Sequence, residues 1–120
     1  MVLSNKGILA ILWELFPRHQ NLLPTFRAAP AGSPYVMKPL FGREGDNISV
    51  VRGEQRSVTD GVYGAEGFVY QEYFELPEFD GQHPVVGSWV IDQEAAGVGI
   101  RESEGPVTRN ESPFVPHVLL

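Results

Sequence analysis

The chain contains no cysteine among its 120 residues. This excludes a disulfide framework, a thiolate zinc site and a thiol nucleophile, so any chemistry must use oxygen and nitrogen groups. Basic residues are few, since nine Lys and Arg stand against fifteen Asp and Glu, and the formal net charge is −6. Such a composition does not provide a basic surface that neutralises a row of phosphates. Nucleic acid is therefore not expected as a partner.

Long apolar runs are also missing. The longest, from Ile8 to Phe16, is interrupted by Glu14 and has about half the length needed to cross a bilayer. The first residues lack the basic segment, apolar core and small-residue cleavage site of a signal peptide. These absences predict no membrane association and favour a cytoplasmic protein.

The N-terminal residues predict one long helix. Ser4 and Asn5 are good helix N-caps, Lys6 to Phe16 contains strong helix formers, and Pro17 ends the pattern. The apolar residues of this segment surround most of the helix axis instead of keeping to one stripe. We therefore expect the helix to be covered on several sides, by further sequence or by another subunit.

The remainder of the chain is predicted to form mainly β-strands. Residues 18–34 are a proline-containing connection, and turn residues then separate several apolar or alternating runs. The expected strands are residues 35–38, 48–51 and 68–74, followed by a hairpin of residues 85–91 and 96–101. With the N-terminal helix they predict the α+β class with a mostly antiparallel sheet. Phe74 and Trp89 are expected to lie in the core, as alternating aromatic residues of small β-rich domains usually do.

Lys38 is the strongest candidate for a functional residue. It ends a short strand directly before a loop that carries Gly42 and Gly45. Glycines let backbone N–H groups approach an oxyanion, and a strand-anchored lysine adds positive charge, so the pair suits a nucleotide phosphate. The loop lacks the Gly-Lys-Ser/Thr ending of a P-loop. A plain hairpin with an exposed lysine therefore remains the alternative interpretation.

Several motifs occur in an order that resembles a known family. They are the segments 5–9 (Asn-Lys-Gly-Ile-Leu), 35–45 (Tyr-Val-Met-Lys-Pro-Leu-Phe-Gly-Arg-Glu-Gly), 70–72 (Tyr-Gln-Glu), 87–89 (Gly-Ser-Trp), 99–102 (Gly-Ile-Arg-Glu) and 114–117 (Phe-Val-Pro-His). Together they resemble the glutathionylspermidine synthase family, and more closely its shorter bacterial members described as acid–amine ligases. The resemblance covers nearly the whole chain, and several motifs in order are more specific than any one.

This resemblance implies part of an ATP-grasp fold and a set of ATP-binding residues. In the family, ATP phosphorylates a carboxylate, and an amine captures the acyl phosphate to form an amide. The cofactor-binding residues that it implies are Lys6, Lys38, Glu44, Gly45, Gln71, Glu72, Tyr73 and Phe74. Arg101 is similar to a family arginine near the phosphates, where a guanidinium would assist phosphoryl transfer. An arginine at the end of a surface strand is the plain alternative for Arg101.

The resemblance also implies what the chain lacks. Family members place their magnesium carboxylates, and much of the pocket for the acid and the amine, upstream of the position of Lys6. We therefore expect residues 1–120 to be the C-terminal portion of such a ligase, with Mg²⁺ ligands supplied by other sequence and catalysis by this chain alone in doubt. His19, His83 and His117 have no paired metal-ligand spacing. The competing hypothesis is a noncatalytic module that self-associates or binds a protein partner through exposed apolar surface.

Overall fold

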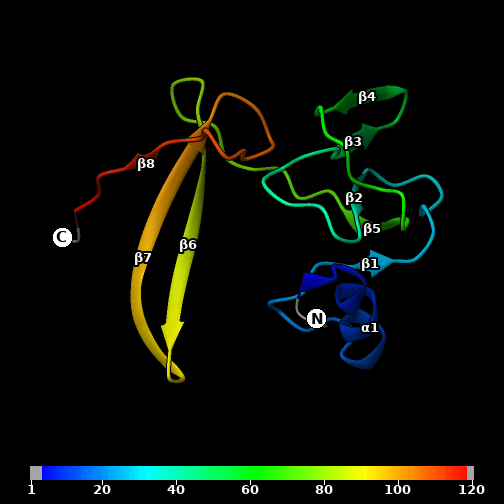
Figure 1. Cartoon of the computed structure of the whole chain (residues 1–120), viewed down its shortest axis with the longest axis horizontal. Coiled ribbons are helices and arrows are strands. Elements are labelled where there is room, and N and C mark those ends of the chain that lie inside the picture. The colour runs from blue at the N-terminus through cyan, green and yellow to red at the C-terminus, as the bar shows by residue number, and fades with distance from the viewer. Residues whose placement is uncertain (1–3, 119–120) are drawn as a thin grey trace. The chain divides into compact units, whose positions relative to one another are not determined.

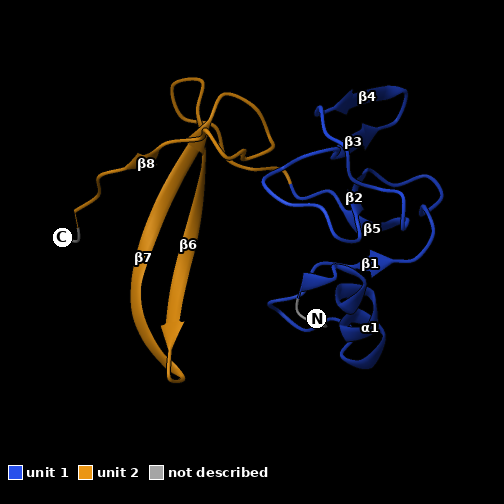
Figure 2. Ribbon diagram, in the orientation of Figure 1, with its two compact units in different colours: residues 1–74 blue, residues 75–120 orange. Residues whose placement is uncertain are grey.

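The structure, a computed structural model, describes residues 4–118. The chain divides into two compact units, residues 1–74 and 75–120, shown in Figure 2. The first unit contains one helix and a five-stranded sheet, and the second contains a three-stranded sheet built on a long hairpin (Figure 1). Within residues 4–118 no helix combines the length and the apolar character needed to cross a membrane.

The N-terminal helix, α1 (Gly7–Leu15), is shorter than the long helix predicted, with only nine residues. Its N-cap residue is Lys6, without a side-chain cap, and not Ser4 or Asn5 as predicted. The side-chain oxygen of Asn5, one residue earlier, accepts a hydrogen bond from the Gly7 N–H at 2.8 Å. The last helical hydrogen bond runs from the Phe16 N–H to the Leu12 carbonyl at 2.8 Å. Pro17 follows and cannot extend this pattern.

The sheet of the first unit is antiparallel throughout. Its strands are β1 (Thr25–Phe26), β2 (Tyr35–Pro39), β3 (Ser49–Arg52), β4 (Gln55–Val58) and β5 (Phe68–Glu72), in the order β1-β5-β2-β3-β4. The register places Lys38 opposite Val69, and Gln71 opposite both Val36 and Thr25. Residues paired across an antiparallel ladder point to the same side of the sheet. Lys38, Gln71 and Thr25 therefore share one face.

The core of the first unit is small. Its buried apolar side chains are Ala10, Pro39, Ile48, Val50 and Val69, accompanied by the buried polar residues Thr25, Ser49 and Gln71. Helix α1 packs against β1 and β5, while Leu15 and Phe16 at its end are 65% and 55% exposed. Cover for this helix by further sequence or by another subunit stays a prediction.

The second unit is a hairpin with one short added strand. Its strands are β6 (His83–Ile91), β7 (Glu94–Ser103) and β8 (Phe114–Val115), in the order β6-β7-β8. Asp92 and Gln93 form the hairpin turn with φ of 48° and 68°, the left-handed conformation that a two-residue turn between twisted strands requires. This confirms the predicted hairpin, with longer strands than expected.

The predicted core positions of two aromatic residues are wrong. Phe74 is 63% exposed and Trp89 is 62% exposed. Phe74 lies beyond the end of β5 at Glu72 and so leaves the sheet, although residues 68–74 were predicted as one strand. Trp89 belongs to a single-layered sheet whose alternate side chains point to both faces, and its unit adds no second layer within the described residues.

The α+β class and the mostly antiparallel pairing are confirmed. The sequence pattern also predicted β2, β3 and β5, the last with two residues too many. It missed β4, and it missed β1 and β8, which have two residues each and lie in proline-containing stretches. Strands this short carry no alternation that a pattern search can detect.

Candidate functional site

Lys38 lies in β2 with its ammonium held by a neutral side chain. Its Nζ donates a hydrogen bond to the Gln71 Oε1 at 2.6 Å. Burial lowers the pKa of Lys38 from its ordinary value, and repulsion from the charge of Lys6 lowers it further. No carboxylate forms an ion pair with Lys38 anywhere in residues 4–118. The ammonium is thus partly desolvated without a compensating negative charge.

Lys6 directly precedes α1, and the structure brings its charge within range of Lys38. Its backbone N–H donates to the Leu40 carbonyl at 2.8 Å, and its ammonium donates to the Gly42 carbonyl. Burial lowers the pKa of Lys6, and the nearby Arg43 lowers it further. Two of the predicted site residues, from the helix start and from β2, therefore form one cluster of positive charge with the loop that follows β2.

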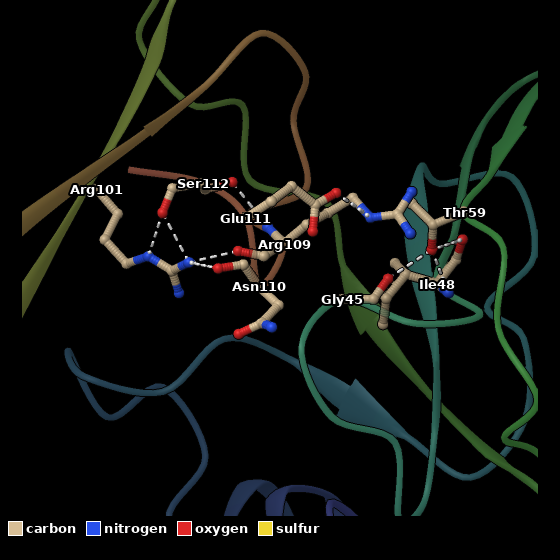
Figure 3. Close-up of polar contacts among 8 residues, drawn as sticks. All are labelled: Gly45, Ile48, Thr59, Arg101, Arg109, Asn110, Glu111 and Ser112. Carbon is tan, nitrogen blue, oxygen red and sulfur yellow. Dashed lines mark hydrogen bonds and ion pairs between the residues drawn. The ribbon is translucent and has the colours of Figure 1, made fainter. Parts of the chain in front are cut away.

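The loop from Gly42 to Asn47 is tied down at both ends instead of hanging free. Lys6 holds the Gly42 carbonyl. At the other end the Thr59 hydroxyl donates to the Gly45 carbonyl at 2.5 Å (Figure 3), and the Asn47 side-chain amide donates to the Tyr63 carbonyl. Glu44 and Gly45 have φ of 55° and 76°, a conformation that costs glycine little but that a residue such as Glu44 adopts less readily.

The middle of this loop presents unused hydrogen-bond donors. No acceptor within residues 4–118 receives a hydrogen bond from the backbone N–H of Arg43, Glu44 or Gly45. The Glu44 side chain is exposed to solvent. Successive N–H groups without a partner, beside positive side chains, are groups that can bind an anion.

Recognition of adenine by the segment from Gln71 to Phe74 would require hydrogen-bonding groups that are not already in use. The Gln71 side chain is buried and bonded to Lys38. The N–H groups of Glu72 and Tyr73 donate to the Pro24 and Pro34 carbonyls at 2.8 and 3.1 Å. The Phe74 N–H makes no hydrogen bond to the part of the chain that the structure describes. Of the four residues, Phe74 therefore keeps a free backbone donor.

Arg101 lies in β7 of the second unit, where carbonyl oxygens surround its guanidinium (Figure 3). It donates to the Ser112 carbonyl from Nε at 3.1 Å and from Nη2 at 2.8 Å, and to the Asn110 carbonyl at 3.0 Å. The guanidinium carbon also lies 5.3 Å from the centre of the Phe114 ring. These contacts describe a side chain that fastens the 109–112 turn to the hairpin. A catalytic role for Arg101 stays a prediction.

Three contributors to this arrangement were not predicted from the sequence. Thr25 supports Gln71, Thr59 holds the loop, and Gly61 allows the segment 59–63 to approach the loop closely. A β-carbon at Gly61 would lie 2.6 Å from the Asn47 nitrogen, which only glycine tolerates. Thr25 and Thr59 are common polar residues whose partners are far away in sequence, so no local signal could have identified them.

A concave, mostly apolar pocket of about 590 Å³ lies beside α1. It is lined by Asn5, Gly7, Ile8, Ile11, Arg27, Leu40, Phe41, Phe68 and Val69. Neither predicted lysine lines it, although Asn5, Gly7, Leu40 and Phe41 neighbour the lysine cluster or its loop in sequence. No group of three or more His, Asp or Glu side chains suited to a metal ion occurs within residues 4–118.

Comparison with known proteins shows the family of the chain. The family described as "Glutathionylspermidine synthase preATP-grasp" matches residues 1–120. The chain is similar to a protein of Haemophilus influenzae named "Putative acid--amine ligase", with 44% identity over 134 aligned positions that include the whole chain and 33% of the relative. It is also similar to the trypanothione synthetase of Crithidia fasciculata, with 33% identity over 95% of the chain and 18% of the relative.

A third relative is the bifunctional glutathionylspermidine synthetase/amidase of Escherichia coli, with 32% identity over 98% of the chain and 20% of that protein. The relatives are thus proteins named as ligases or synthetases. The chain belongs to the glutathionylspermidine synthase preATP-grasp family, which confirms the predicted relationship to glutathionylspermidine synthases. It spans a third or less of the length of the curated relatives that it matches.

Proposed function

We propose that the first unit binds the polyphosphate of ATP as part of an acid–amine ligase. The observation that carries this proposal is the pair of ammonium groups at Lys6 and Lys38, which repel each other and have no carboxylate partner within residues 4–118. A buried positive charge without a counter-charge is unfavourable. An anionic ligand would relieve that cost, and perturbed groups of this kind are typical of functional sites.

The loop after β2 supports the same proposal. The free N–H groups of Arg43, Glu44 and Gly45 would donate to phosphate oxygens next to the two ammonium groups. Because both ends of the loop are held by hydrogen bonds, these donors are oriented before a ligand arrives, which reduces the ordering cost of binding. The exposed ring and free N–H of Phe74 are the best remaining candidates for contact with the adenine.

The reaction proposed for the complete ligase follows from the family. ATP would supply a phosphoryl group that activates a carboxylate, and an amine would then displace phosphate to form an amide. This chain would contribute positive charge to oxygens that carry negative charge during the transfer. No group of three or more His, Asp or Glu side chains suited to a metal ion occurs among the described residues, and no step here is assigned to a metal. The acid and the amine would be bound by parts of the ligase outside the aligned third.

Calorimetric titration of the 120-residue chain with ATP and with magnesium ATP tests the proposal. Lys38→Met should weaken ATP binding at least about tenfold. A tenfold change in affinity corresponds to roughly 1.4 kcal/mol, and a hydrogen bond to a charged group contributes more than this, about 1.5–3 kcal/mol. Arg18→Gln is the matched control, since Arg18 is exposed and its loss changes the net charge equally. Folded wild-type protein that binds no ATP would rule out the proposal.

A second candidate function is self-association, favoured by the free edge of β6. This nine-residue edge strand contains no acidic residue and no lysine or arginine, although such charges commonly protect natural sheet edges. Val86, Val90 and Ile91 in it are 64–65% exposed. In this alternative a second copy of the chain pairs along β6, with or without nucleotide binding. Sedimentation equilibrium tests it, and a monomer at all accessible concentrations would exclude it.

A further inference from the structure

We propose that Thr25 and Gln71 are positioning residues that orient the Lys38 ammonium toward a phosphate group. The inference rests on the proposed function, because it assigns a role to residues behind the lysine that would contact the nucleotide. It differs from the family-based prediction for Gln71, which placed this residue in the segment that recognises adenine.

The three side chains form a continuous hydrogen-bonded relay across one face of the sheet. The Lys38 Nζ donates to the Gln71 Oε1 at 2.6 Å, and the Gln71 Nε2 donates to the Thr25 Oγ1 at 3.0 Å. The Thr25 hydroxyl in turn donates to the Leu23 carbonyl at 3.0 Å. The residues come from β2, β5 and β1, which lie side by side in the order β1-β5-β2.

The relay has only one consistent direction. The single hydroxyl proton of Thr25 is committed to the Leu23 carbonyl, so Oγ1 can only accept from Gln71. The amide nitrogen of Gln71 must then face Thr25, and its oxygen must face Lys38. Thr25 is 2% exposed and Gln71 is 9% exposed. Water therefore competes little with these bonds, and the amide is kept in this orientation.

A neutral acceptor has a particular consequence for the lysine. An ammonium group has three N–H donors, and the hydrogen bond to Gln71 uses one of them. The other two have no partner within the described residues, and the positive charge is not neutralised. A glutamate in place of Gln71 would hold the lysine equally well but would cancel the charge. The amide thus fixes the position of the ammonium and leaves its charge to a ligand.

The test uses Thr25→Val, which keeps the shape of the side chain and removes its hydroxyl, with Thr25→Ser as the conservative control. The chain has only two lysines, so the two lysine ε-methylene signals can be followed by NMR, and Lys6→Arg assigns them. Thr25→Val removes the acceptor of the Gln71 Nε2 and so loosens the side chain whose oxygen holds the Lys38 ammonium. We expect the pKa of Lys38 to fall further and the ATP affinity to drop several-fold, with both restored in Thr25→Ser.

Gln71→Glu provides a second, nearly isosteric variant that does not depend on the folding of Thr25→Val. It should raise the pKa of Lys38 and still weaken ATP binding, a combination that a purely structural role would not produce. An unchanged Lys38 titration in folded Thr25→Val, or unchanged ATP affinity in folded Gln71→Glu, overturns the positioning role. Absence of ATP binding to wild-type protein overturns the proposed function, and the Lys38 titration still reports separately on the relay.

Discussion

The hydroxyl of Thr59 donates a hydrogen bond to the Gly45 carbonyl at 2.5 Å, across fourteen residues of chain. The same oxygen accepts a hydrogen bond from the Ile48 N–H at 2.9 Å (Figure 3). One side chain thus fixes both the loop after β2 and the entry to β3. The unused N–H groups of Arg43 and Glu44 lie just before Gly45, so their orientation depends on this anchor.

Replacing Thr59 by valine should destabilise the first unit and loosen the loop. Thr59→Val keeps the shape but leaves the N–H of Ile48, a residue that is 8% exposed, without its partner, and an unsatisfied buried donor costs about 1–3 kcal/mol. Urea unfolding measures the loss, and hydrogen exchange of residues 43–48 measures the loosening. Thr59→Ser retains the hydroxyl and should change both much less. Equal behaviour of the two variants would contradict the role given to the hydroxyl.

Gly61 should tolerate no side chain. A β-carbon there would lie 2.6 Å from the Asn47 nitrogen and 2.7 Å from the Asp46 β-carbon, and relieving such overlap costs about 1–3 kcal/mol. We expect Gly61→Ala to lower the free energy of unfolding by that amount and to shift the amide signals of residues 45–47. Gly105→Ala is the control, because a β-carbon there meets nothing within 4 Å. Similar unfolding curves for both variants would argue against the close approach.

The sequence predicted those parts of the fold that have local signals. Alternation and glycine-rich turns identified β2, β3 and the β6–β7 hairpin, and α1 begins and ends one residue inside the predicted segment 6–16. Burial was harder to predict. Trp89 has the sequence signature of a core residue yet is 62% exposed, because burial depends on a second layer of structure and not on the residue itself.

Some residues of the candidate site could likewise be predicted from the sequence, and others could not. Lys38 and its glycine loop could be singled out by spacing, and the family resemblance added Lys6, which lies far from Lys38 in sequence. Thr25 and Thr59 could not be found. Their importance arises from hydrogen bonds to Gln71 and Gly45, and such pairings depend on strand order and register. Neither is encoded in the few residues around a threonine.

The lowered pKa of Lys38 predicts opposite effects of pH on stability and on binding. Below its folded-state pKa the half-buried ammonium is charged in both the folded and the unfolded state, and burial disfavours it in the folded one, so it lowers the free energy of unfolding. That penalty disappears as the pH rises from the folded-state pKa to the ordinary value of 10.5. Over the same window ATP affinity should fall, because the charge that attracts phosphate is lost.

Urea unfolding and ATP titration across this alkaline window measure the two trends. Lys38→Arg stays charged throughout and should reduce both pH dependences. A smaller dependence of the same sign should remain from Lys6, whose pKa is also lowered by burial and by Arg43. Identical pH profiles for Lys38→Arg and wild type would mean that Lys38 is not the titrating group.

Arg101 is predicted to stabilise the 109–112 turn whatever its role in catalysis. Its guanidinium donates to the Ser112 and Asn110 carbonyls, and hydrogen bonds to charged groups contribute about 1.5–3 kcal/mol each. Arg101→Ala should speed hydrogen exchange in residues 109–115, and Arg101→Lys should restore only part of the protection, since an ammonium lacks the guanidinium fork. Exchange rates unaffected by Arg101→Ala would remove the anchoring role.

Self-association through β6 should depend on one residue at the centre of the strand. The Glu102 N–H donates to the Pro113 carbonyl. The backbone N–H and C=O groups of Glu102, and of every second residue from it along β7, therefore point toward β8, whereas those of Arg101 point toward β6. The partners on β6 of Glu102 and these alternating residues include Val86 and Ser88, and they therefore direct their backbone groups to the open edge. Two antiparallel copies centred on Ser88 would place Val86 opposite Val90, and Gly87 opposite Trp89, with no like charges facing each other.

Ser88→Lys should abolish that pairing by placing two ammonium groups opposite each other at the two-fold axis, a destabilising arrangement in a sheet. Sedimentation velocity over a range of concentrations measures the change, and Ser33→Lys is the control, because it adds the same charge at an exposed position in the first unit. A dimer that survives Ser88→Lys must form through another surface. The exposed apolar end of α1, at Leu15 and Phe16, would then be the next surface to alter.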